Sequence, residues 1–242
     1  MSGRWIVTHH DVVDGLGQLQ TVHSWRYYEI EQRAEQLTIT RGLHCGDVVV
    51  ASTLLAASAD MRGAWPGTLA NNDYRELSGT SRATADGCEI AFAKQYTVMG
   101  ATAGYYRDPG RPLPTLEQRA SAGAPGWEDW DDDGRPGVTL MISGAVTGSL
   151  FIASRSWHQL TARVRDTEGL IRFTDSWNQE AVTLGYDGTS LLTEQGVKAA
   201  DPSLHFAEAA RLDASQAHGD DAAVCAAVRM LASTLTPTAS QD

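Results

Sequence analysis

The stretch LIRFTDSWN, residues 170–178, decides the fold class of this chain of 242 residues. Its apolar residues Ile171, Phe173 and Trp177 stand two or four positions apart, with mostly polar residues between them. Successive side chains of a β-strand point to opposite faces, so this spacing predicts a strand with one buried face. The sequence therefore indicates a sheet that encloses or covers a core.

The same two-residue period recurs along most of the chain. Clusters of Gly, Asp and Asn separate the apolar runs at short intervals, which is typical of turns. About ten or eleven short strands without interleaved helices predict an antiparallel barrel or sandwich. The strands are expected within 4–13, 24–31, 35–41, 47–53, 74–84, 88–96, 138–143, 149–157, 159–166, 170–178 and 180–188.

Two regions depart from the strand pattern within what we take as a single domain, residues 1–242. Residues 108–137 are rich in Pro, Gly and Asp and predict a long ordered loop. Residues 220–235 predict a C-terminal helix, because Asp220 or Asp221 can serve as its N-cap and Val224 and Val228 begin an apolar stripe. The tail 236–242 is expected to be flexible.

The long loop contains the pattern D-x-D-x-D-G. Asp129, Asp131 and Asp133 stand at alternate positions, and Gly134 permits a sharp turn that brings the carbonyl of Arg135 round to the same point. Oxygen ligands arranged in this way suit Ca²⁺, so we predict a calcium site made by these four residues. The twelfth position lacks the Glu of an EF-hand, so calcium affinity should be weak, and the alternative is a solvated turn.

Gly3-Arg4-Trp5 gives a G-x-W motif at the start of the first predicted strand. With the meandering strands and the C-terminal helix, it resembles the lipocalin or calycin superfamily. The resemblance implies an antiparallel lipocalin-like β-barrel with a C-terminal helix. In an exported protein it also implies a disulfide between Cys45 and Cys225 that ties the C-terminal segment to the barrel wall. The D-x-D-G-x-P-G-V-T segment is similar to uncharacterised secreted bacterial proteins.

Aromatic side chains supply the candidate ligand-binding surface. Within each predicted strand they share one face, and a barrel of about eight or more strands can keep a cavity lined by such residues. We expect at least two of Trp157, Phe173 and Trp177 to face the interior, whereas the alternative is that the aromatic residues simply fill a core. The full set is Trp25, Tyr27, Phe151, Trp157, Phe173 and Trp177.

Charge and motifs exclude several function classes. The formal net charge of −11 disfavours nucleic acid and anionic membranes as partners. No apolar run approaches the roughly 20 residues that span a bilayer. Adjacent His9 and His10 should point to opposite faces of a strand, and the other histidines show no ligand spacing. No nucleophile elbow, HExxH or P-loop motif is present.

An enzyme could still assemble a site from residues that are distant in sequence. Asp11, Glu29, Arg155 and Asp175 are polar members of predicted strands that either line an interior or face solvent. We expect a non-catalytic protein that holds a small, largely apolar ligand in a barrel cavity, in the periplasm or outside the cell. The alternatives are a calcium-stabilised extracellular interaction module and a barrel-type enzyme with a dispersed acid–base site.

Overall fold

The fold was analysed in a computed structural model. It describes residues 1–15, 18–50, 55–58, 78–102, 110–115, 126–131, 133–144, 147–165, 169–188, 198–199, 201–213, 216 and 218–235. The tail 236–242, residues 103–107, and residues 108–109 and 116–125 of the long loop lie, with the other gaps, outside the described residues.

The described chain is mainly β, as predicted, and its strands belong to one antiparallel sheet. The helix at the end of the chain, α3 (Asp221–Leu235), also matches the prediction. The strands are β1 (Gly3–Gly15), β2 (Gln18–Arg33), β3 (Gln36–Val50), β4 (Leu55–Ser58), β5 (Ser78–Thr84), β6 (Gly87–Phe92), β7 (Gln95–Met99), β8 (Val138–Gly144), β9 (Gly148–Val164), β10 (Ile171–Gly188), β11 (Lys198–Ala199) and β12 (Phe206–Leu212), with a 3-10 turn, η4 (Pro202–Leu204), before β12.

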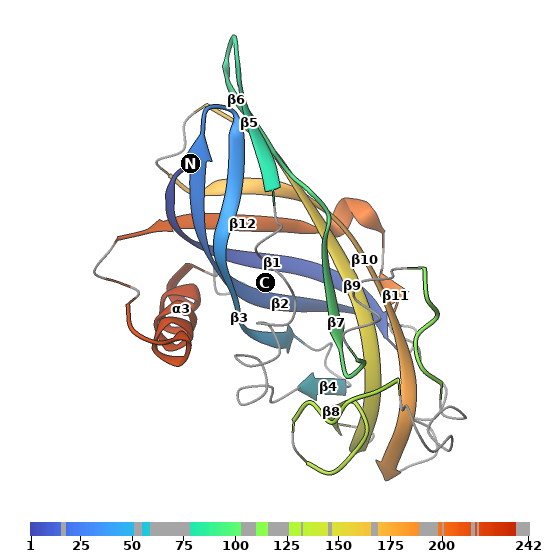
Figure 1. The fold of residues 1–242 in the computed structure, drawn as a ribbon. Coiled ribbons are helices and arrows are strands. Elements are labelled where there is room, and N and C mark those ends of the chain that lie inside the picture. The colour runs from blue at the N-terminus through green and yellow to red at the C-terminus, as the bar shows by residue number, and fades with distance from the viewer. Residues whose placement is uncertain are drawn as a thin grey trace, which may run out of the picture.

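The sheet closes in a ring (Figure 1). Neighbouring strands follow the order β10, β12, β1, β2, β3, β5, β6 and β9, and β9 pairs again with β10. Strand β1 therefore lies between β2, its neighbour in sequence, and β12, which is formed some 200 residues later. Strands β7 and β8 both pair with β9, β4 continues the sheet beyond β8, and β11 pairs with β1.

Several strands are longer than the sequence pattern predicts. The runs 149–157 and 159–166 join in β9, and the runs 170–178 and 180–188 join in β10. No turn-forming cluster separates the two runs of either strand, and β9 pairs with β10 along almost its whole length. The runs 35–41 and 47–53 likewise share β3, whose pairing with β2 shifts register at two bulges. The bulges let one long strand bend round the ring.

The ring interior divides into an apolar half and a polar half. The apolar half is one core cluster to which the inner faces of the ring strands contribute, including Trp5 of the G-x-W motif. Along β10 the predicted alternation holds, because Ile171, Phe173 and Trp177 are buried and the residues between them are exposed, except for buried Asp175. The polar half holds buried charged and hydrogen-bonding side chains.

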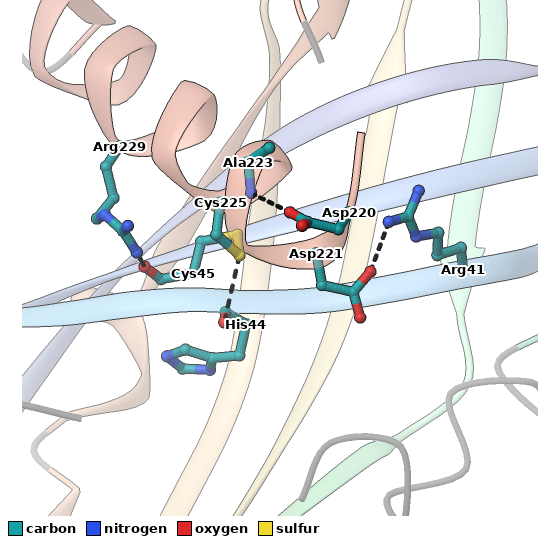
Figure 2. The surroundings of a disulfide bond; sticks show 8 residues. All are labelled: Arg41, His44, Cys45, Asp220, Asp221, Ala223, Cys225 and Arg229. Carbon is teal, nitrogen blue, oxygen red and sulfur yellow. Dashed lines mark hydrogen bonds and ion pairs between the residues drawn. A yellow bond between two sulfur atoms is a disulfide. The ribbon is translucent and has the colours of Figure 1, made fainter. Parts of the chain in front are cut away.

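Helix α3 covers the outer face of β1, β2 and β3, where a second apolar cluster forms. The Asp220 carboxylate accepts a 2.9 Å hydrogen bond from the backbone N–H of Ala223, so Asp220 is the N-cap. Val224 and Val228 are fully buried, as the predicted stripe requires. The helix also makes an ion pair between Asp221 and Arg41 of β3, with 2.5 Å between its oxygen and nitrogen (Figure 2).

A disulfide between Cys45 and Cys225 fastens α3 to β3, which confirms the pairing that the lipocalin resemblance implied (Figure 2). The guanidinium of Arg229 adds a 2.8 Å hydrogen bond to the carbonyl of Cys45. The disulfide joins residues 180 positions apart. A closed loop of this length restricts the unfolded chain and stabilises the fold by about 5 kcal/mol in the chain-entropy account. Within the described residues, no helix has the length and apolar character of a bilayer span.

Candidate metal centre

Four ionisable side chains meet in the polar half of the ring. His9 and Asp11 come from β1, His158 from β9 and Asp175 from β10, and all four are buried. Each offers one ligand atom within 4.8 Å of those of the other three. The two-residue period explains the arrangement on β1, because His9 and Asp11 share the inward parity of Val7, a core residue.

Asp175 binds both histidines through one oxygen. Its Oδ2 lies 2.6 Å from Nδ1 of His9 and 2.8 Å from Nδ1 of His158. An ionised carboxylate can only accept hydrogen bonds, so both Nδ1 atoms carry the proton and donate it. Each imidazole then keeps the lone pair on Nε2, which is the tautomer that a metal ligand needs.

Asp11 lies on the opposite side of His158 from Asp175. Its Oδ2 is 4.0 Å from Nε2 of His158, and its Oδ1 is 4.0 Å from Nδ1 of His205, which precedes β12. The backbone N–H of Val12 donates a 3.1 Å hydrogen bond to that Nδ1 atom, so His205 carries its proton on Nε2. His205 is therefore a donor at the edge of the cluster, whereas His9 and His158 present lone pairs.

The protonation states follow from burial. Desolvation lowers the pKa of His9 to about 3, with further lowering by the charges of Arg26 and His158. Desolvation also lowers the pKa of His158 to about 4. Burial alone would raise the pKa of Asp175, but interactions with His158 and His9 outweigh it and hold that pKa far below its usual range. Near neutral pH the cluster thus contains neutral imidazoles and an ionised Asp175, the states in which these groups bind metals.

Two atoms of the cluster lack the hydrogen bond that burial demands. Nε2 of His9 is fully buried and has no hydrogen-bond partner among the described residues, and the same holds for Oδ1 of Asp175. A buried polar atom without a partner costs about 1–3 kcal/mol. Two ligands that share one ion stand at most about 4.2 Å apart at zinc–nitrogen distances, which is close to the 4.8 Å within which one ligand atom from each of the four residues lies.

The predicted aromatic residues do not form one surface. Phe173 lies in the core cluster of the ring, and Trp177 stacks on His158 with ring centroids 5.9 Å apart and meets His205 edge-on at 4.9 Å. Two of the three residues expected to face the interior therefore do so, and Trp177 packs against the four-residue cluster.

The other four aromatic residues point away from the interior. Trp25 and Tyr27 belong to the outer cluster beneath α3. Phe151 packs in a third cluster with Leu113 of the long loop, on the face of β9 opposite to Leu150 and Ile152. Trp157, next to inward His158, is half-buried, and the Lys94 ammonium lies 3.9 Å from its ring centroid. The structure thus brings Phe173 and Trp177 to the interior but not Trp25, Tyr27, Phe151 or Trp157.

The loop predicted to bind calcium forms a compact turn. Asp129, Asp131 and Asp133 each place a carboxylate oxygen within 4.8 Å of the others. Asp129 accepts hydrogen bonds from the backbone N–H groups of Asp133 at 3.2 Å and Gly134 at 2.9 Å, and Asp133 accepts one from Arg135 at 2.8 Å. The hydroxyl of Thr139 donates to Asp133 and its N–H to Asp131.

Hydrogen bonds therefore occupy most of the carboxylate oxygens that the calcium prediction requires. The side chain of Arg135 points toward Asp187, with 3.7 Å between nitrogen and oxygen. Participation of its carbonyl in a calcium site stays a prediction.

The sequence pattern drew attention to two of the four residues in the buried cluster. The sequence leaves open whether four polar strand residues line an interior or face solvent. Asp11 and Asp175 line the interior, whereas the other two lie on the outer face, Glu29 beside Tyr27 and Arg155 beside Glu180. The sequence did not indicate His9 as a ligand, because His9 and His10 point to opposite faces of the strand, or His158, which shows no ligand spacing. The H-x-D pattern of His9 and Asp11 was the available signal, since residues two apart on a strand share a face.

Comparison of the chain with protein-family models, curated proteins and solved structures found no match. The functional argument therefore rests on the geometry of the cluster itself.

Proposed function

We propose that this protein binds a first-row divalent transition-metal ion inside a lipocalin-like barrel. The observation that carries the proposal is the state of His9. Its Nδ1 is held by Asp175, while its Nε2 is fully buried without a partner among the described residues. A bound cation would supply that partner and would offset the negative charge buried nearby.

The ligands proposed are Nε2 of His9, Nε2 of His158 and the carboxylate of Asp11. Asp175 acts as a positioning residue, because its hydrogen bonds to both Nδ1 atoms fix the tautomers and orientations of the two imidazoles. Two imidazoles and one carboxylate leave further coordination positions for water or another ligand.

The ligand types select the metal class. Imidazole nitrogen suits Zn²⁺, Fe²⁺, Ni²⁺ and Cu²⁺, whereas Ca²⁺ and Mg²⁺ prefer sites made only of oxygen. The neutral state of His9 and His158 favours uptake near neutral pH, since a metal need not displace a proton from Nε2. We therefore propose a divalent ion of this first-row group as the resident ion and use Zn²⁺ as its representative.

A second candidate function is carriage of a small, largely apolar ligand in the same interior. It is supported by a cavity of about 20 Å³ whose wall includes Trp5, Phe92, Phe173 and the ring of His158. A space of this size takes one water or one methyl-sized group, so the ligand must be small unless the wall rearranges.

We also propose that the protein works in an oxidising compartment outside the cytoplasm. The Cys45–Cys225 disulfide supports this location, because such bonds persist where thiols are not kept reduced.

The test is metal binding by the full chain after treatment with a chelator. Isothermal titration with Zn²⁺, and visible absorption on titration with Co²⁺, should show one site per chain in the wild type. His9→Ala should weaken binding more than about 100-fold, because removal of an orienting group alone typically costs 10–100-fold.

His10→Ala is the matched control. His10 is the next residue, but it faces the outer side of β1, where it stacks on Phe206. Equal affinities of wild type, His9→Ala and His10→Ala would contradict the proposal. Mass spectrometry under native conditions would show separately whether an organic ligand co-purifies.

A further inference from the structure

The charges buried in the ring interior do not balance once a metal ion is bound. Among the described residues, Asp11, Asp175 and Arg26 are the buried Asp and Arg side chains that face the interior. With neutral imidazoles at His9 and His158 their formal sum is −1, and a divalent ion changes it to +1. An unbalanced charge away from water is costly, so a bound monoanion would complete the site.

Arg26 stands where it can bind that monoanion. On β2 it follows Ser24, the direct partner of His9 on β1, by two positions, so Arg26 is a diagonal neighbour of His9 on the same face. Its Nη1 donates a 2.9 Å hydrogen bond to Oε1 of Gln95 on β7. Gln95 is in turn the direct cross-strand partner of His158. The guanidinium thus extends from beside His9 to beside His158.

Gln95 supplies a second donor at the same place. Its Oε1 accepts hydrogen bonds from Arg26 and from the hydroxyl of Tyr28, at 2.9 and 2.8 Å. These bonds fix the amide with its Nε2 directed elsewhere, and that buried Nε2 has no hydrogen-bond partner among the described residues. A guanidinium and an amide N–H are the groups that commonly bind a carboxylate.

The remaining wall is apolar. Gln95 and His158 both line the cavity of about 20 Å³, together with Trp5, Phe92 and Phe173. A ligand that binds here can therefore place its charged end between Arg26 and the metal and a short apolar group in the cavity. The cavity volume limits that group to about the size of a methyl.

We propose that a small monocarboxylate is an exchangeable ligand of the metal, with its carboxylate held by Arg26 and Gln95 and its alkyl group in the apolar cavity. This inference rests on the proposed metal site. It names the class of molecule that the site recognises, an alkyl monocarboxylate of the size of acetate.

The experiment uses the full chain loaded with Co²⁺ and titrated with acetate, while the visible absorption of the cobalt is recorded. Acetate should shift the cobalt bands in a saturable way. Acetamide, which has the same shape but no charge, should not, and pivalate should bind at least tenfold more weakly than acetate because its three methyl groups exceed the cavity.

Arg26→Met should lower acetate affinity at least tenfold, measured on protein whose cobalt bands show that metal is bound. Arg33→Met is the matched control, since the side chain of Arg33 is 88% exposed. Two results would overturn the inference and leave the metal site standing. The first is that acetate does not shift the cobalt bands, and the second is that the wild type binds acetate and pivalate with equal affinity. Absence of cobalt bands would overturn the proposed function itself.

Discussion

Two groups of candidate metal ligands lie in different surroundings. The His9–Asp11–His158–Asp175 cluster is buried inside the ring, and the Asp129–Asp131–Asp133 cluster lies on a partly exposed turn. In the buried cluster, Nε2 of His9 has no described hydrogen-bond partner. In the exposed turn, backbone N–H groups and the side chain of Thr139 already satisfy five of the six carboxylate oxygens, and Oδ1 of Asp131 is the one without a described partner.

The difference teaches that regular spacing of ligand-type residues in the sequence does not by itself leave their ligand atoms free to bind a metal ion. The D-x-D-x-D-G spacing is regular, but the same spacing lets Asp129 and Asp133 accept hydrogen bonds from their own turn. The buried ligands have no regular spacing, yet the closed ring brings them together and Asp175 fixes their tautomers. The following experiments compare the two clusters, from the largest expected effect to the smallest.

Removal of the Cys45–Cys225 disulfide tests whether the geometry of the buried cluster depends on the attachment of α3 to β3. The double change Cys45→Ser, Cys225→Ser should lower the free energy of unfolding in urea by about 5 kcal/mol. Affinity for Co²⁺ should change by less than about threefold, because the disulfide lies on the outer face of β3 and the cluster lies inside the ring. Cys88→Ser, which removes the free cysteine, is the control. A tenfold loss of cobalt affinity would show that the disulfide helps to position the cluster.

Zinc should stabilise the folded protein through the buried cluster. At a free concentration 100 times its dissociation constant, Zn²⁺ should add about 2.7 kcal/mol to the free energy of unfolding. For a chain of this size that corresponds to a rise in melting temperature of about 5–10 °C. Differential scanning calorimetry of wild type and His158→Ala checks it, and an equal rise in both proteins would place the zinc elsewhere.

Asp175→Asn should weaken Co²⁺ binding by about 10–100-fold without abolishing it. The amide oxygen of Asn is uncharged and accepts the two N–H hydrogen bonds more weakly, and its NH2 group can donate instead, so the tautomers of His9 and His158 are fixed less firmly. Asp131→Asn on the exposed turn is the matched control and should leave cobalt affinity unchanged. Complete loss of binding in Asp175→Asn would instead make Asp175 a direct ligand.

Calcium should have the smallest effect. Millimolar Ca²⁺ should raise the free energy of unfolding by about 1 kcal/mol or less, as expected for a dissociation constant near 10⁻³ M. The ion must compete with the hydrogen bonds that the three carboxylates already accept. Thermal melting in calcium and in chelator, repeated on Asp131→Ala, measures the difference. A larger stabilisation by calcium than by zinc would reverse the ranking of the two clusters.

The sequence predicted the parts of the fold that local period governs. The alternation of Ile171, Phe173 and Trp177 identified the inner face of β10, and Val224 and Val228 identified the buried face of α3. The run 149–157 did not show which face lies inside, because β9 is buried on both faces from Leu150 to Arg155. The two-residue period shows that Phe151 and Trp157 share one face of β9, but it does not show whether that face lies toward the ring interior or toward the outside.

The candidate site was predictable only in part, for a physical reason. Asp175 shares the parity of Phe173, so its inward position follows from the strand period. Its partners depend on which strands become neighbours, and no local pattern specifies that β10 joins β9 on one side and β12 on the other. The neutral state of His9 is likewise a consequence of burial and not of its sequence neighbours.

The position of β1 between β2 and β12 sets the order in which the protein can be completed. During synthesis β1 carries His9 and Asp11 long before β9, β10 and β12 exist, and one edge of β1 lacks its partner until residue 212 has been made. Contacts so distant in sequence form late and slowly. The four-residue cluster therefore assembles in the closing step of folding, and uptake of the proposed metal ion would report that the ring is complete.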